Sequence, residues 1–439
     1  MPMSGNPQLA EDSGASAGRN LGLGLCAFTL MLDGLDNQIL GLVMPSLMAD
    51  WGLERSTFTP FIIATVVLMS AGTSLGGWLG DRFGRKPILF ASLALLGALT
   101  IASGLANNPS QLLVLRGLSA LGMGGVMPNA TALLAEYVSL RHRSLSVSLG
   151  VAAIPLGGVM GGVLGSIILP AFGWRTMFFM AGGITLLAAF VISSLLPESP
   201  ALKTARSRPA SPGRNEPGEA GYAPQEGPAD HGGKQTIFSK ALRRDTLALW
   251  CALFFSMLGV YSMINWVPTL LSQQGYGLST ASLGLALFNA GGILASVVVA
   301  AAMDRYGSRK PLLLTGLVGG LVAMAAIPAL APGNAPILAI VPLGAMGFFI
   351  AGMQAALIAF SAQVYPTAMR STGMGAMMAF GRLGALASSV TGTVILGLGS
   401  AHFLAAMGAT IVIAGFTSLL ARSRAASPRP LRQPVAAAT

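Results

Sequence analysis

The sequence predicts an all-α integral membrane protein whose twelve transmembrane helices form two pseudo-symmetric six-helix bundles. The first observation is composition, because 53% of the residues are hydrophobic and only 9% are charged, against roughly 25% charged residues in a soluble domain. The second is that long apolar runs recur along the chain, and most exceed the roughly 20 residues that cross a bilayer as a helix. The third is a motif in the first half that returns in the second.

The apolar runs, taken in order, fall into two sets of six on either side of a polar gap. Glycine is abundant, with 57 residues, which suits the close approach of helices in lipid. The predicted spans are 21–48, 57–80, 87–106, 111–136, 144–169 and 175–196, followed by 246–271, 279–303, 311–331, 337–363, 371–397 and 400–421.

The formal net charge of +11 reflects membrane topology rather than nucleic-acid binding, because Lys and Arg gather in alternate loops. Positive-inside reasoning places these loops and both termini in the cytoplasm of a cell with a bacterial-type inner (plasma) membrane. The expected organisation is a tail (1–20), a first bundle (21–196), a cytoplasmic linker rich in Pro, Gly and Ala (197–245), a second bundle (246–421) and a second tail (422–439).

Two sequence echoes relate the halves. The segment DRFGRKP (81–87) returns as DRYGSRKP (304–311), in each case after the second span of its half. The segment AEY (135–137) is matched by AQVY (362–365) after the fourth span, at nearly the same offset. The echoes indicate duplication, and internal repeats around a central site are typical of secondary transporters.

The pattern G-x-x-x-D-R-x-G-R-K at 77–86 resembles the signature of the major facilitator superfamily, although Ala300 replaces the leading glycine of the second copy. Within that superfamily the chain resembles the aromatic acid:proton symporters, in particular the hydroxybenzoate and hydroxyphenylpropionate carriers. The features that carry this resemblance are DGLD (33–36) in the first span, Arg116-Gly117 followed by GMGG (122–125), and PESP (197–200). The resemblance implies the major facilitator fold and transport by alternating access.

Asp33 and Asp36 are the candidate proton-coupling residues. They stand three residues apart, so both project from one face of the first span near its midpoint. A carboxylate at that depth costs about 2.5–3.5 kcal/mol to insert. Two neighbouring buried carboxylates repel each other, so at least one is expected to bind a proton near neutral pH. Asp36, beside Asn37 and Gln38, is the favoured carrier, and the alternative is a structural polar pair.

Arg116 and Arg382 are the candidate substrate-binding residues. Arg116 lies in the fourth span and Arg382 near the middle of the eleventh. A guanidinium suits bidentate binding of a carboxylate. We expect Arg116 to hold either the substrate or an aspartate of the first span. Arg382 is expected to pair with Asp33, Asp36 or the substrate, unless it has a purely structural role.

The repeated motif supplies candidate gating residues. We expect Glu136, Asp81 and Arg85 to form a network that locks the cytoplasmic side when the carrier faces outward. The remaining candidates in the motif and its copy are Arg82, Asp304 and Arg305.

Other polar and aromatic side chains are available to line a site, although ordinary packing is the commoner role for each. The polar ones are Asn129, Tyr261, Asn265, Asn289 and Gln354, and the aromatic ones are Phe255, Phe288, Phe348 and Phe349. Trp51, Trp174 and Trp266 are expected to anchor the outer membrane interface.

Several function classes are excluded. The sequence contains no G-x-x-x-x-G-K-[ST] phosphate loop, so ATP is not the expected energy source. It has no metal-ligand spacing and no nucleophile–base arrangement, so we expect no metal, no cofactor and no enzymatic activity.

The leading hypothesis is therefore proton-coupled uptake of an aromatic carboxylate (a benzoate, hydroxybenzoate or phenylpropionate) by a monomer whose partners are the organic anion, protons and membrane lipid. The alternatives are a carrier of another organic anion, such as a sugar acid or dicarboxylate, a drug:proton antiporter, and a transport-dead sensor.

Overall fold

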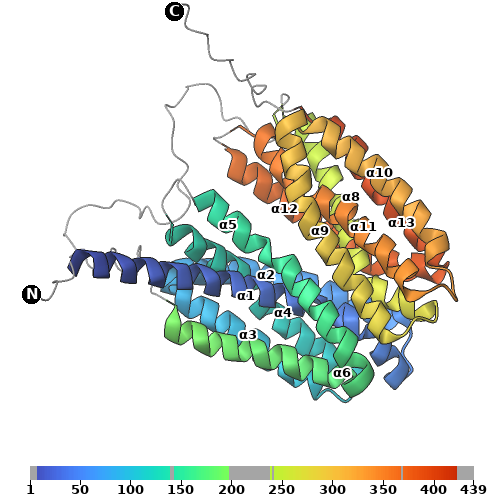
Figure 1. The fold of residues 1–439 in the computed structure, drawn as a ribbon, viewed down its shortest axis with the longest axis horizontal. Coiled ribbons are helices and arrows are strands. Elements are labelled where there is room, and N and C mark those ends of the chain that lie inside the picture. The colour runs from blue at the N-terminus through green and yellow to red at the C-terminus, as the bar shows by residue number, and fades with distance from the viewer. Residues whose placement is uncertain (1–6, 139–142, 197–237, 240–241, 367–368, 423–439) are drawn as a thin grey trace, which may run out of the picture.

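The computed structural model describes residues 7–138, 143–196, 238–239, 242–366 and 369–422, and those residues are almost entirely helical (Figure 1). Most of the linker predicted at 197–245 and of the tail at 422–439 lies outside the described residues. The helices of the first half are α1 (Pro7–Trp51), the short 3₁₀ helix η1 (Arg55–Phe58), α2 (Thr59–Phe83), α3 (Arg85–Gly104), α4 (Pro109–Glu136), α5 (Arg143–Val151) and α6 (Ala153–Leu195). Those of the second half are α8 (Arg243–Gln273), α9 (Leu278–Tyr306), α10 (Arg309–Ala329), α11 (Pro336–Val364), α12 (Arg370–Gly397) and α13 (Ser400–Leu419).

Within the described residues, ten helices are long and apolar enough to cross a membrane. The segment Leu149–Leu195 counts once among them, but Gly173 interrupts its helix with φ 75° and ψ 177°, so it provides two crossings. Helix α1 is not among the ten, because Asp33, Asp36 and their neighbours dilute its apolar run. With α1 and the division at Gly173, the predicted twelve-helix fold is confirmed.

The two halves repeat the same packing scheme. In the first half α1 packs on α6, α2 on α4, and α3 on α6. In the second half α8 packs on α12, α9 on α11, and α10 on α13, which are the corresponding pairs. The repeated motif also has the same backbone in both halves, because Gly84 and Gly307 take positive φ values of 105° and 76° at equivalent turns. The duplication read from the sequence is therefore present in the fold.

Glycine lets the helices approach closely, as the composition predicts. A methyl group added at Gly76 of α2 would lie 2.5 Å from the Cα atom of Gly125 on α4. Nothing larger than hydrogen fits at that crossing without separating the helices.

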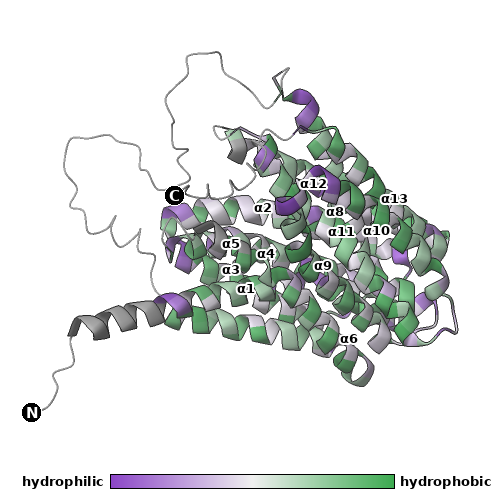
Figure 2. Cartoon of the chain, turned by 45° about the horizontal axis from the view of Figure 1, so that its top comes forward, coloured by the Kyte–Doolittle hydropathy of each residue, from purple (hydrophilic) through white to green (hydrophobic). Residues whose placement is uncertain are grey.

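The two ends of the bundle differ in charge. One end, here called the basic end, contains the turns between α2 and α3 and between α9 and α10, with Arg82, Arg85, Arg305 and Lys310. Hydrophobic residues cover most of the helices, and hydrophilic residues form scattered segments among them (Figure 2). The other end, here called the opposite end, contains η1 and the turns that follow α1, α3, α8, α10 and α12.

The halves contact each other toward the opposite end and diverge toward the basic end (Figure 1). At the opposite end the Thr59 and Thr393 hydroxyls lie 3.1 Å apart, and Arg55 donates to the side-chain oxygen of Gln273 at 3.3 Å. This conformation is closed at the opposite end.

Two of the predicted interface tryptophans are instead part of the packed interior. The Trp174 indole donates to Asp50 at 2.8 Å and meets the ring of Trp51 edge-on, which ties the break in α6 to the end of α1. Trp266 is fully buried and donates toward the carbonyl of Ser388 at 3.3 Å. The interface prediction was wrong for Trp174 and Trp266 because both rings are buried among protein side chains and have almost no surface left for the membrane interface.

Candidate functional site

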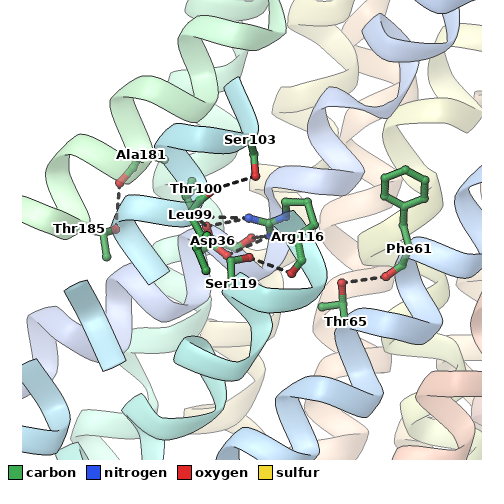
Figure 3. A network of polar contacts seen from close by, with 10 residues as sticks. All are labelled: Asp36, Phe61, Thr65, Leu99, Thr100, Ser103, Arg116, Ser119, Ala181 and Thr185. Carbon is green, nitrogen blue, oxygen red and sulfur yellow. Dashed lines mark hydrogen bonds and ion pairs between the residues drawn. The ribbon is translucent and has the colours of Figure 1, made fainter. Parts of the chain in front are cut away.

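Asp36 and Arg116 form a bidentate ion pair inside the first half (Figure 3). Arg116 Nη2 lies 3.0 Å from Asp36 Oδ2, and Nη1 lies 3.1 Å from Oδ1. The Thr100 hydroxyl on α3 donates to the same Oδ1 at 2.7 Å. The two charged residues are only 2% and 1% exposed, and both carboxylate oxygens accept charge-assisted hydrogen bonds.

The surroundings of Arg116 also belong to the first half. Its guanidinium lies 5.7 Å from the ring centroid of Phe178 on α6, and Nη2 also donates to the main-chain carbonyl of Asp36 at 3.2 Å. A buried guanidinium needs an anionic partner, and here Asp36 supplies it. Of the two partners predicted for Arg116, the structure contains the aspartate of the first span.

Asp33 has a different environment from Asp36. It is half-buried one helical turn earlier in α1, and within the described chain its Oδ1 is buried without a hydrogen-bond partner. An uncompensated buried carboxylate is costly.

Asp33 belongs to a cluster that spans both halves. Tyr261 on α8 lies near the side chain of Asn37 and within electrostatic reach of both Asp33 and Arg382. Arg382 on α12 is half-buried, and no described carboxylate lies within ion-pair distance of it. We call Asp33, Asn37, Tyr261 and Arg382 the central cluster. It combines a cation, an acid and two neutral hydrogen-bonding groups, which are the functions needed to bind an anion together with a proton.

A pair of amides joins the halves close to this cluster. Gln38 Nε2 donates to Asn289 Oδ1 at 2.9 Å, and Asn289 Nδ2 donates to Gln38 Oε1 at 2.8 Å. The residues are 3% and 5% exposed and come from α1 and α9. Gly158 on α6 packs so closely that an added Cβ atom would collide with both amides. We call Gln38 and Asn289 the amide clasp.

The other polar and aromatic residues considered from the sequence are more scattered. Asn129 donates to the carbonyls of Gly76 and Gly125 within the first half. Phe288 is buried, and Phe348 packs on Phe349. Thr100, which holds Asp36, had no distinctive signal in the sequence, since a threonine in an apolar run is common.

The predicted gating residues divide into two groups. Arg85 pairs with Glu136, and it also lies 3.5 Å from Asp81. This network joins α2, α3 and α4, which all belong to the first half. Arg82 instead lies over the rings of Trp78 and Phe83.

The second copy of the motif lacks this ion pair in the described chain. Asp304 and Arg305 are exposed, and the Ser308 hydroxyl donates to Gln363 at 2.7 Å. Gln363 stands at the position of Glu136, and Ser308 directly precedes Arg309, the counterpart of Arg85, so a neutral hydrogen bond replaces the charged contact.

The family model for the major facilitator superfamily matches residues 26–389 and again 280–438. The chain belongs to this superfamily. Its members are transporters, so the chain is a multi-pass membrane transporter and not an enzyme.

Among curated relatives, the 4-hydroxybenzoate transporter of Pseudomonas putida is 36% identical over 85% of this chain and 86% of its own length. The gallate transporter of the same organism is 35% identical, with 85% of each chain covered. The 3-(3-hydroxy-phenyl)propionate transporter of Escherichia coli is 30% identical over 95% of this chain and 98% of its own.

Solved structures agree with the fold. A bacterial homologue of the human lysosomal transporter Spinster, in an inward-facing and occupied conformation, matches with a TM-score of 0.70 and 16% identity, over 92% of this chain and 96% of that one. A D-xylose–proton symporter matches with a TM-score of 0.66 and 16% identity, over 91% of this chain and 97% of that one. At this identity the likeness establishes the architecture alone.

Proposed function

We propose that the protein takes up aromatic carboxylates together with protons across the inner membrane of a bacterium. The observation that carries this proposal is the central cluster, in which Tyr261 lies within electrostatic reach of both an acid, Asp33, and an arginine of the other half, Arg382, for which the described residues supply no carboxylate partner. The names of the curated relatives, which include transporters of 4-hydroxybenzoate, gallate and hydroxyphenylpropionate, give the class of substrate. Because one chain contains both halves of the cluster, we propose that a monomer suffices.

Arg382 is the proposed partner of the substrate carboxylate. Its planar guanidinium matches a carboxylate bidentately, and no described acid occupies it. Arg116 is less suited to this role, since both of its terminal nitrogens already bind Asp36. Tyr261 and Asn37 are available to hydrogen-bond a ring hydroxyl.

Asp33 is the proposed proton carrier, in place of Asp36, which the sequence favoured. A carboxylate bound at Arg382 would be repelled by an ionised Asp33 in the same cluster, so the bound anion favours a proton on Asp33. By linkage, the proton favours the anion equally. A proton on Asp36 would not be coupled in this way to an anion bound at Arg382, because Arg116 already compensates the charge of Asp36. The Asp36–Arg116 pair would instead fix the part of α1 that presents Asp33.

The basic end is proposed to face the cytoplasm, together with both tails and the linker. This orientation follows from the positive-inside rule. The structure is then the inward-facing conformation, and the amide clasp is part of the closed periplasmic side. In the outward-facing conformation the two amides would separate, while the network of Asp81, Arg85 and Glu136 would help to close the cytoplasmic side.

The experiment for the substrate class is uptake of radiolabelled acids into proteoliposomes with the outside acidic. We expect 4-hydroxybenzoate to accumulate and 4-hydroxybenzyl alcohol, which lacks the carboxylate, not to compete. Arg382→Gln should abolish uptake. Preferential uptake of a sugar acid or dicarboxylate would show that the substrate is not an aromatic acid. Drug export without anion uptake would indicate an antiporter. Binding without counterflow would indicate a sensor.

The two aspartates are separated by comparing two modes of transport. Asp33→Asn should keep substrate exchange between the two sides but lose accumulation driven by a pH gradient. Asp36→Asn should keep a residual pH response at a lower transport rate. The opposite result, with accumulation retained in Asp33→Asn and abolished in Asp36→Asn, would identify Asp36 as the proton carrier instead.

A further inference from the structure

The second half has an apolar groove on a different side from the central cluster. It has a volume of about 370 Å³ and lies between α9 and α10, with α11 as its floor. Val298 and Ala302 line one wall, Leu314 and Val318 the other, and Phe348 and Phe349 the floor. A second groove of about 480 Å³ continues from the same two phenylalanines along α9 and α11, past Leu294 and Gly344.

The grooves lie within membrane-spanning helices and open outward. Leu314, Val298 and Leu294 are 59%, 46% and 59% exposed, which for residues of these spans means exposure to acyl chains rather than to water. Every residue that lines either groove belongs to the second half. The grooves are therefore separate from the transport path proposed between the halves.

At the basic end the groove changes character. Tyr306 and Lys310 line it there, and both are exposed. The guanidinium of Arg305 lies 5.5 Å from the ring centroid of Tyr306. Asp304 is the acidic residue of this turn, and Arg309 donates to the carbonyl of Ala421. Cations thus outnumber the acid where the apolar groove reaches the membrane surface.

We propose that this groove binds an anionic phospholipid, with an acyl chain along Phe348 and Phe349 and the phosphate at Lys310. An apolar groove that is open to the bilayer is filled by hydrocarbon, because acyl chains rather than water surround these spans. Basic pockets between transmembrane helices on the cytoplasmic side suit anionic head groups. The groove thus combines walls that suit an acyl chain with a lysine at its end that suits a phosphate. The proposal does not depend on the substrate or on proton coupling.

The test is native mass spectrometry of the protein released from nanodiscs that contain equal amounts of phosphatidylglycerol and phosphatidylcholine. The wild type should retain phosphatidylglycerol preferentially. Lys310→Gln removes the head-group contact and should lower that retention about fivefold, which corresponds to one lysine near an anionic surface. Ala302→Phe fills the groove and should lower the retention of both lipids.

The chain offers a matched control for each variant. Lys86→Gln changes the lysine at the equivalent position of the first copy of the motif, and Leu321→Phe adds bulk to an exposed α10 position outside the residues that line the groove. Both should retain lipid as the wild type does. Equal retention of the two lipids by the wild type, or the same loss in Lys86→Gln as in Lys310→Gln, would overturn the proposal. Unchanged retention in Ala302→Phe would do so as well, and melting temperatures in detergent verify that each variant is folded.

Discussion

The amide clasp predicts a reciprocal exchange of side chains. Gln38 and Asn289 meet through two hydrogen bonds of 2.9 and 2.8 Å between the halves. Gln38→Asn shortens one arm by a methylene and breaks the contact, and Asn289→Gln lengthens the other arm against Gly158. The double exchange Gln38→Asn/Asn289→Gln keeps the combined length of the two arms, so the amides can meet again.

The magnitude follows from the number of hydrogen bonds. Each contributes about 0.5–1.5 kcal/mol net, so losing both costs about 1–3 kcal/mol. That shifts the equilibrium between conformations about 5–150-fold toward the state open at the opposite end. The double exchange should recover most of the shift.

The assay is the distance between spin labels attached at Ser110→Cys and Ala335→Cys, which are exposed positions at the opposite end of the two halves. Cys26→Ala and Cys251→Ala remove the native thiols from the background. Each single substitution should lengthen the main distance, and the double exchange should shorten it again. If the double exchange behaves as the sum of the singles, the amides do not act as a clasp.

Three further predictions follow from individual contacts. Gly158→Ala places a methyl group against both amides and should shift the protein toward the state open at the opposite end, as the single clasp variants do. Gly183→Ala, where an added Cβ meets no atom within 4 Å, should not cause this shift. The same spin-label distance measures both variants. Arg116→Ala leaves the carboxylate of Asp36 buried and unpaired, so it should lower stability by about 3–5 kcal/mol, measured as a lower melting temperature in detergent; failure of an added Asp36→Asn substitution to recover part of that loss would contradict the reasoning. Arg85→Gln should lower the melting temperature more than Arg82→Gln, because Arg85 forms an ion pair with Glu136 whereas Arg82 lies over aromatic rings. Equal effects would show that this network adds no stability.

The fold was predictable from the sequence because lipid imposes simple rules. Apolar runs of helix length and the position of Lys and Arg determine the spans, and the repeated motif relates the halves. The first and last residues of individual helices were harder to predict than their number and order. Helix α1 begins at Pro7 rather than near residue 21, because a helix can extend beyond the apolar run that crosses the membrane. Asp245, assigned to the linker, lies buried in the first turn of α8.

The candidate site was predictable in its members but not in its pairing. Asp33, Asp36, Arg116 and Arg382 stand out because charges within membrane spans are costly and need a reason. Which acid meets which arginine depends on the rotation of α1, α4 and α12 about their axes, and spacing within one helix does not determine it.

The amide clasp shows the same limit. In the sequence Asn289 is one polar candidate among several, and Gln38 is a neighbour of Asp36. Their contact joins residues 251 positions apart in the chain, and no local pattern in the sequence encodes it.

The most direct test of the central claim is proton movement that accompanies substrate. Proteoliposomes that contain a pH-sensitive dye receive 4-hydroxybenzoate from outside at neutral pH, and the signal of protein-free liposomes is subtracted to remove passive entry of the acid. We expect internal acidification with the wild type and none with Asp33→Asn, although that variant still exchanges labelled substrate. Substrate entry without acidification in the wild type, or full acidification in Asp33→Asn, would contradict it.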